Sequence, residues 1–189
     1  MSPLIDLIGS AKGYGWGGLL PTGDFESIST VTVGAGGLST ITFSSIPSTY
    51  THLQIRCYDK DDRGFAGSAS SLRFNSDSGA NYSDHGLVGD GTSIVSYATT
   101  SGTSAGLGNT AGGLNSNIYG IQLVDILDYA DTNKNKTIRT LGGADQNGFG
   151  FSGLFSGSWR STSAVNSITL YPLATLFNQY SSFALYGIK

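Results

Sequence analysis

The sequence predicts an all-β fold, an antiparallel β-sandwich that follows a short N-terminal arm. Apolar and polar residues alternate in short runs, glycine-rich turns separate these runs, and no long helical pattern follows residue 23. Alternation with a period of two residues buries one face of a sheet and leaves the other face in water. We therefore expect a sandwich or a barrel built from strands of this kind.

The clearest unit is the strand, turn and strand over residues 36–56, whose second strand places Leu53, Ile55 and Cys57 on one face. Pro47 and small hydroxyl residues fill the connector at 44–51, which cannot readily continue a ladder. The same pattern predicts strands at residues 25–33, 38–43, 52–59, 71–75, 82–89, 93–98, 118–127, 136–144, 151–159, 165–171 and 182–188. Since a jelly roll needs about eight strands, these suffice for a jelly roll and an extra hairpin.

Two stretches between the predicted strands are predicted to be exposed loops. Residues 99–117 consist almost entirely of Gly, Ser, Thr, Ala and Asn, which offer little to bury. Residues 129–135 form a second, more polar loop. Recognition at the outer end of the protein would use these loops.

Residues 1–23 differ from the rest of the chain and predict an attachment arm, with the sandwich domain at 24–189. Apolar residues recur at the spacing of one helical turn and are followed by an aromatic and glycine run; the candidate attachment residues are Leu4, Ile5, Leu7, Ile8, Tyr14 and Trp16. This segment is too short and too rich in glycine to be a stable helix alone. Its apolar side chains either cover one end of the chain's own core or dock onto another protein, where Trp16 would be the anchor.

Composition excludes several classes of protein. The 189 residues include 28 glycines and 39% hydrophobic residues but only 12% charged residues, a balance unlike that of a disordered chain. The formal net charge of −3 and the lack of a basic cluster argue against nucleic acid as a partner. No apolar stretch approaches the roughly 20 residues of a membrane helix, and no secretion signal is evident. We expect a soluble protein, made in a cytoplasm, with no membrane partner.

No pattern of residues predicts catalysis, a metal site or a cofactor. His52 and His85 lack metal-ligand spacing, and the run at 82–85 resembles a catalytic triad only in residue type. The charged group at 59–63 lacks the spacing of a calcium loop and is interpreted as a solvated loop. Glycine runs at 13–18 and 34–37 lack the residues of a phosphate loop. The lone Cys57, on an inward strand position, is expected to be a small buried hydrophobe.

Three segments resemble a recurring family of tailed-bacteriophage structural proteins. They are TITFSSIPSTYTHLQIR at 40–56, LRFNSDSGANYS at 72–83 and SFALYGIK at 182–189, with ITLYPLATLFNQYSSF at 168–183 fitting the penultimate strand. IDLIGSAKGYGWG at 5–17 is similar to an attachment segment of such proteins. The resemblance implies a jelly-roll β-sandwich in the virion, without enzymatic activity and assembled as a homotrimer. The chain lacks the repetitive shaft of a long fibre, which favours a compact attached knob.

The sequence and the resemblance together lead to a ranked set of expectations. The first is a non-enzymatic virion protein, assembled in the host bacterial cytoplasm and attached by its arm to the major capsid protein or to neck or tail proteins. It would serve as a capsid decoration (cement) protein or a short head or neck fibre. The alternative is a tail or baseplate appendage that binds host-surface glycan through aromatic residues such as Tyr97, Tyr119 or Tyr129. A glycan depolymerase is the third and least supported interpretation. It stays open because the two carboxylates of such an enzyme can be far apart in the sequence and still meet in the fold.

Overall fold

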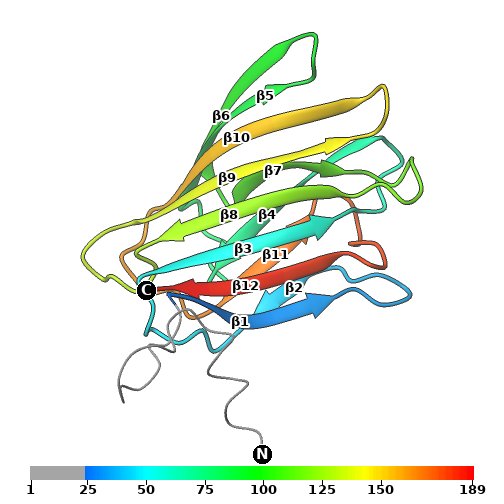
Figure 1. Ribbon diagram of the computed structural model, residues 1–189. Coiled ribbons are helices and arrows are strands. Elements are labelled where there is room, and N and C mark those ends of the chain that lie inside the picture. The colour runs from blue at the N-terminus through cyan, green and yellow to red at the C-terminus, as the bar shows by residue number, and fades with distance from the viewer. Residues whose placement is uncertain (1–23) are drawn as a thin grey trace, which may run out of the picture.

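The computed structural model describes residues 24–189, which form two packed antiparallel sheets (Figure 1). The predicted attachment residues at positions 4–16 lie outside the described residues. Residues 24–189 contain no helix long and apolar enough to cross a membrane. The strands are β1 (Phe25–Thr32), β2 (Ile41–Phe43), β3 (His52–Asp59), β4 (Gly67–Phe74), β5 (Tyr82–Gly89), β6 (Ile94–Gly102), β7 (Ala105–Ala111), β8 (Gly120–Leu127), β9 (Lys136–Asp145), β10 (Gly150–Trp159), β11 (Ile168–Pro172) and β12 (Ser182–Ile188).

The connectivity is that of a jelly roll with two inserted hairpins. The larger sheet has eight strands in the order β1-β12-β3-β8-β9-β10-β5-β6, and the smaller has four in the order β2-β11-β4-β7. When the hairpins β5–β6 and β9–β10 are left out, the first remaining strand pairs with the last, and each following strand pairs with the one before that. The pairs are β1 with β12, β2 with β11, β3 with β8, and β4 with β7. This is the nested pairing of a jelly roll. The expected β-sandwich is therefore confirmed, with one more inserted hairpin than the strand count predicted.

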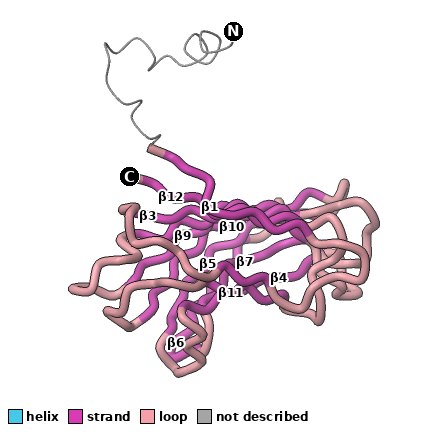
Figure 2. The backbone as a smooth tube through the Cα atoms, turned by 90° about the horizontal axis from the view of Figure 1, so that it is seen from below, coloured by secondary structure: helices cyan, strands magenta, loops and turns pink. Residues whose placement is uncertain are grey.

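The core lies between the two sheets, which Figure 2 shows from the side. Inward side chains of β3 alternate with outward ones, so that Leu53, Ile55 and Cys57 are buried and the expectation for Cys57 is confirmed. The smaller sheet contributes its own inward residues, among them Leu72, Phe74, Ile168 and Leu170. Full burial of such a side chain contributes about 1.5–3 kcal/mol. The alternation read from the sequence thus produces the core directly.

The predicted exposed loop at 99–117 is wrong, because it contains strand β7 and the end of β6. β7 pairs with β4, and five of its seven residues are buried. Its small residues make room for a facing ring, since a Cβ on Gly108 would lie 2.1 Å from the Phe155 ring. Gly108 also has a φ of +92°, a conformation that glycine adopts without strain. Small residues here permit close packing of the two sheets, which is why a composition that predicts an exposed loop instead forms a buried strand.

The predicted solvated loop at 59–63 is also wrong, because its first three residues are buried. The Asp61 carboxylate accepts hydrogen bonds from the Ser68 hydroxyl and, at 3.3 Å, from the Ala174 backbone N–H. Asp62 Oδ1 accepts hydrogen bonds from the backbone N–H groups of Thr175 and Leu176, both at 2.9 Å. These carboxylates therefore fasten the β3–β4 loop to the β11–β12 loop. Within residues 24–189 no cluster of three or more His, Cys, Asp or Glu side chains could hold a metal ion.

Asp59 is a buried carboxyl group whose side-chain oxygens have no hydrogen-bond partner. The Thr110 hydroxyl donates to the backbone carbonyl of Asp59 at 2.9 Å. Burial raises the pKa of Asp59 to about 7, and the charge of Asp61 adds to this effect. The folded protein therefore holds a proton on Asp59 at pH values where the unfolded chain has lost it.

We predict that stability falls as pH rises from about 4 to about 7 and that Asp59→Asn removes this fall. Between the ordinary pKa of 3.8 and the folded value of about 7, the folded state binds more protons than the unfolded state, so rising pH favours unfolding. Urea unfolding across this range measures it: parent and variant should be similar near pH 4. Near pH 8 the variant should be more stable by on the order of 4 kcal/mol. An equal pH dependence in both proteins would contradict the assignment.

Candidate functional site

The outer face of the larger sheet carries a row of leucines across four neighbouring strands. Leu123 of β8 pairs with Leu141 of β9, Leu141 with Leu154 of β10, and Leu154 with Leu87 of β5. Leu141, Leu154 and Leu87 are 58%, 52% and 50% exposed. These four residues are called the leucine row below. An outward sheet face is normally polar, so an apolar row in exact register marks this face as a candidate interaction surface.

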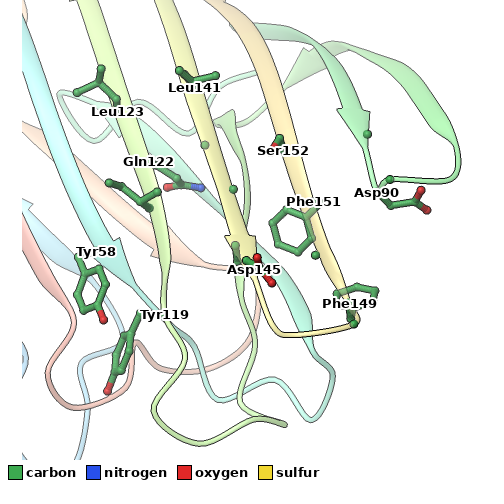
Figure 3. Close-up of a pocket in the computed structure, with 18 of the residues that line it drawn as sticks. Tyr58, Asp90, Tyr119, Gln122, Leu123, Leu141, Asp145, Phe149, Phe151 and Ser152 are labelled. Atoms are coloured by element: carbon green, nitrogen blue, oxygen red, sulfur yellow. The ribbon is translucent and has the colours of Figure 1, made fainter.

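A hollow lies beside the leucine row, towards the β9–β10 hairpin. The next outward row runs from Tyr58 through Ile121 and Gly143 to Ser152 and Gly89, so that glycine twice replaces a side chain. The result is a hollow of about 1290 Å³ with a largely apolar lining. Figure 3 shows this hollow and the side chains around it.

Aromatic side chains border the hollow on the β3 side. Tyr58 and Tyr119 stack with ring centroids 4.9 Å apart (Figure 3). The Tyr119 hydroxyl donates to the Gln179 carbonyl at 2.7 Å. Further along the same face, the Arg56 guanidinium lies over the rings of Phe25 and Tyr186, at 5.0 and 5.1 Å from their centroids. The stacked tyrosine rings, and the guanidinium held over Phe25 and Tyr186, are rigid groups. Such groups suit recognition of a partner with a flat surface.

A polar row borders the leucine row on its other side. Asp125 accepts hydrogen bonds from Gln54 Nε2 at 2.9 Å and from Arg139 Nη2 at 2.7 Å. Continuing in register, Ser156 and His85 face the same way. Ion pairs as exposed as that of Arg139 contribute little to stability, roughly 0–1 kcal/mol. The polar row therefore sets one boundary of the apolar surface and adds little to the fold.

The two carboxylates that line the hollow are both occupied in hairpin turns. Asp90 Oδ1 accepts the backbone N–H groups of Ser93 at 2.7 Å and Thr92 at 2.8 Å, and these bonds hold the pKa of Asp90 well below its usual range. Asp145 Oδ1 accepts the backbone N–H of Asn147 at 2.9 Å. Both groups cap turns.

The run at 82–85 that resembles a triad in composition is divided by the sheet. Asp84 points inward and accepts the Gly106 N–H at 3.2 Å, whereas His85 points outward into the polar row. His52 also lies on the outer face, where its Nδ1 accepts the backbone N–H of Asp128 at 3.0 Å. Successive residues of a strand point to opposite faces, so Asp84 cannot orient the His85 ring.

The three tyrosines named as candidate glycan contacts lie in different environments. Tyr119 borders the hollow. Tyr97 of β6 lies against Phe155, with ring centroids 6.1 Å apart, and covers Gly86. Tyr129 is fully buried and donates a hydrogen bond to the Pro47 carbonyl, so its proposed contact with a ligand is wrong.

Sequence reasoning missed the leucine row, although the sequence does contain a signal for it. Each of the four strands carries a leucine in the middle of the face assigned to water; in β8 the outward Leu123 stands beside the inward Val124. A strand with apolar residues at both parities is a candidate for burial on both faces. What the sequence does not give is the register that places the four leucines side by side.

We predict that the leucine row contributes little to folding and much to surface hydrophobicity. The double substitution Leu141→Thr and Leu154→Thr should change the free energy of unfolding by less than about 1 kcal/mol, since both side chains are half exposed. The same variant should elute earlier from a phenyl column. As the matched control, Leu170→Ala, in the buried core, should cost about 2–5 kcal/mol. A comparable loss of stability in both variants would show that the row is part of the core.

No family model, no curated protein and no solved structure matches this chain. The outer face of the larger sheet is thus described by its own geometry: an apolar row, a hollow beside it, and flanking aromatic and polar residues.

Proposed function

We propose that this chain is a non-enzymatic structural protein of a tailed-phage virion, a capsid decoration (cement) protein or a short head or neck fibre. In this proposal the outer face of the larger sheet is buried against neighbouring subunits or the particle surface. The observation that carries the proposal is the leucine row, which is in register across four strands and has three of its four side chains exposed.

An exposed apolar row supports an assembly role because soluble monomers seldom display one. Contiguous apolar patches beyond a few hundred Å² mark interaction sites on proteins. The side chains of the leucine row stand on a sheet, so they form a broad surface that suits another broad surface. Burial of Leu141 and Leu154 by a partner would remove their remaining exposed area from water, with a gain of about 25 cal/mol per Å².

The sequence resemblance supports the same proposal independently. It implies a jelly roll, and residues 24–189 have that connectivity. It also implies that residues such as Leu4, Ile5 and Trp16 fasten the protein to the particle, and that copies assemble as a homotrimer. The low charge of the chain, 12% of its residues, suits a protein whose surfaces are largely shared between subunits.

We predict that deletion of residues 1–18 abolishes incorporation into particles and preserves the fold. Both sheets and the core between them come from residues 25–188, so the truncated chain should melt within a few degrees of the parent. Quantitative mass spectrometry of purified particles gives the readout. The parent should be present in numbers comparable to the major capsid protein if it decorates the capsid, and in far smaller numbers at a neck. A truncated chain that is incorporated normally would contradict the role of the arm.

A second candidate function is a tail or baseplate appendage that binds host-surface glycan. The observation that favours it is the stacked pair Tyr58 and Tyr119 at the edge of the hollow. Aromatic faces pack against the apolar faces of sugar rings, and polar groups such as Ser152 could then pair with sugar hydroxyls.

This second function predicts that Tyr119→Ala weakens glycan binding about tenfold or more. Titration of bacterial surface polysaccharides by calorimetry measures the affinity, and Leu127→Ala is the control, at the opposite end of the same sheet face. Equal affinities of the two variants would place any glycan outside the hollow.

A further inference from the structure

Strand β6 forms an edge of the larger sheet, at the end opposite β1 (Figure 1). β5 pairs with one side of it, and no strand of residues 24–189 lies on its other side. The nine residues of β6 contain no charged residue and no proline, and Ile94 and Val95 are 76% and 57% exposed. A long, uncharged and exposed edge of this kind is a template for pairing with another strand.

The other three edge strands carry features that discourage pairing. β2 has only three residues. β1 has an irregular register between Ser27 and Ser29, and the Glu26 carboxylate stands near its start. β7 contains Gly108 at a φ of +92°, which interrupts its regular geometry. β6 has a register shift of its own, between its pairs with Tyr82 and Asp84, but residues 94–99 pair with β5 without interruption. In the described part of the chain, this regular stretch of β6 is therefore the edge that is left open.

The hairpin at the start of β6 determines which of its backbone groups face outward. The Asp90 N–H donates to the Ser93 carbonyl at 3.2 Å. Asp90 and Ser93 are therefore a hydrogen-bonded pair of the ladder, next to the turn. Bonded and non-bonded pairs alternate along an antiparallel ladder. Ile94, Ser96 and Ala98 therefore direct their N–H and C=O groups away from β5, towards the open side.

We propose that β6 pairs antiparallel with β6 of a second copy of this chain. The two-fold axis passes midway between the Ser96 residues of the two copies, which face each other. The contact joins the two larger sheets edge to edge into one continuous sheet. It does not depend on the virion assignment, because it follows from the geometry of the edge alone.

The side chains select this register. With the axis at Ser96, Ile94 faces Ala98 of the second copy, and Val95 faces Tyr97 of the second copy, so apolar residues meet apolar residues on both faces. An aromatic residue opposite a β-branched one is among the favourable cross-strand pairs. An axis at Tyr97 would instead place Val95 opposite Thr99. The edge is thus self-complementary, which identifies a second copy as its occupant.

The same axis extends the apolar outer face. Ser96 pairs in register with Leu87, the last member of the leucine row. Because the axis is perpendicular to the sheet, the outer faces of both copies lie on the same side. The leucine rows of the two copies then fall on one line, separated by the two Ser96 residues. Pairing through β6 therefore doubles the length of the candidate interaction surface.

Disulfide cross-linking of the full-length chain tests this contact. In a bonded antiparallel pair the two Cα atoms are about 5.5 Å apart, within the range of a disulfide. Ser96→Cys should give a covalent dimer on a non-reducing denaturing gel after mild oxidation. Thr100→Cys is the matched control, since its two copies would be roughly 25 Å apart in this register. Cys57 is buried, so the parent should remain uncross-linked. The absence of a dimer in Ser96→Cys, or equal dimer in both variants, would overturn the proposal.

A proline substitution provides a second, non-covalent test. The Ser96 N–H points away from β5, so Ser96→Pro removes no bond within its own sheet but blocks the partner strand. The molar mass of Ser96→Pro in solution, measured by sedimentation, should be half that of the parent. Its melting temperature should be similar to that of the parent. Ser96→Ala keeps the N–H and should retain the parent mass. An unchanged mass for Ser96→Pro would overturn the proposal, whether it reflects a monomeric parent or contact through another surface.

Discussion

A sheet of four strands cannot cover a sheet of eight, and much of the exposed surface of this protein follows from that mismatch. The nested pairs of the jelly roll bury the inner faces of β12, β3 and β8 and partly bury that of β1. The inserted hairpins then extend the larger sheet past the smaller one, so that β6 is exposed at every residue except its last, Gly102. The exposed edge is thus a direct result of where the hairpins were inserted.

The end of the core is closed by one aromatic side chain and the glycines around it. Phe155 is 2% exposed, and a Cβ on Gly86, Gly108 or Gly153 would lie within 3 Å of its ring. Three strands of the larger and smaller sheets therefore approach one ring closely, and the glycines that allow this lose the most conformational entropy on folding. The abundance of glycine in this chain is in part a packing requirement at the point where the smaller sheet ends.

Period-two alternation predicted the fold class and eleven of the twelve strands, because buried and more exposed residues alternate along strands such as β3, β8 and β12. It failed at β7, where Gly108 and its small neighbours are buried by contact with Phe155, an interaction across the sandwich that no local pattern reveals. It failed again at Asp59 and Asp61, whose burial depends on a distant loop and on Thr110. The leucine row was missed for a related reason: its residues are visible in the sequence, but their alignment depends on strand register.

The open edge and the apolar outer face are best understood together. An edge strand without charge or proline is a hazard to a monomer, because it pairs with any exposed strand. A particle subunit is held at a fixed position among its neighbours, and there the same edge has a defined partner. The leucine row is in the same situation, since it is costly in water and useful when covered. Charged residues on either surface would protect a free monomer but would be buried unpaired in an assembly, at a cost of several kcal/mol each. The low charge of both surfaces is therefore more consistent with a subunit of an assembly than with a solitary protein.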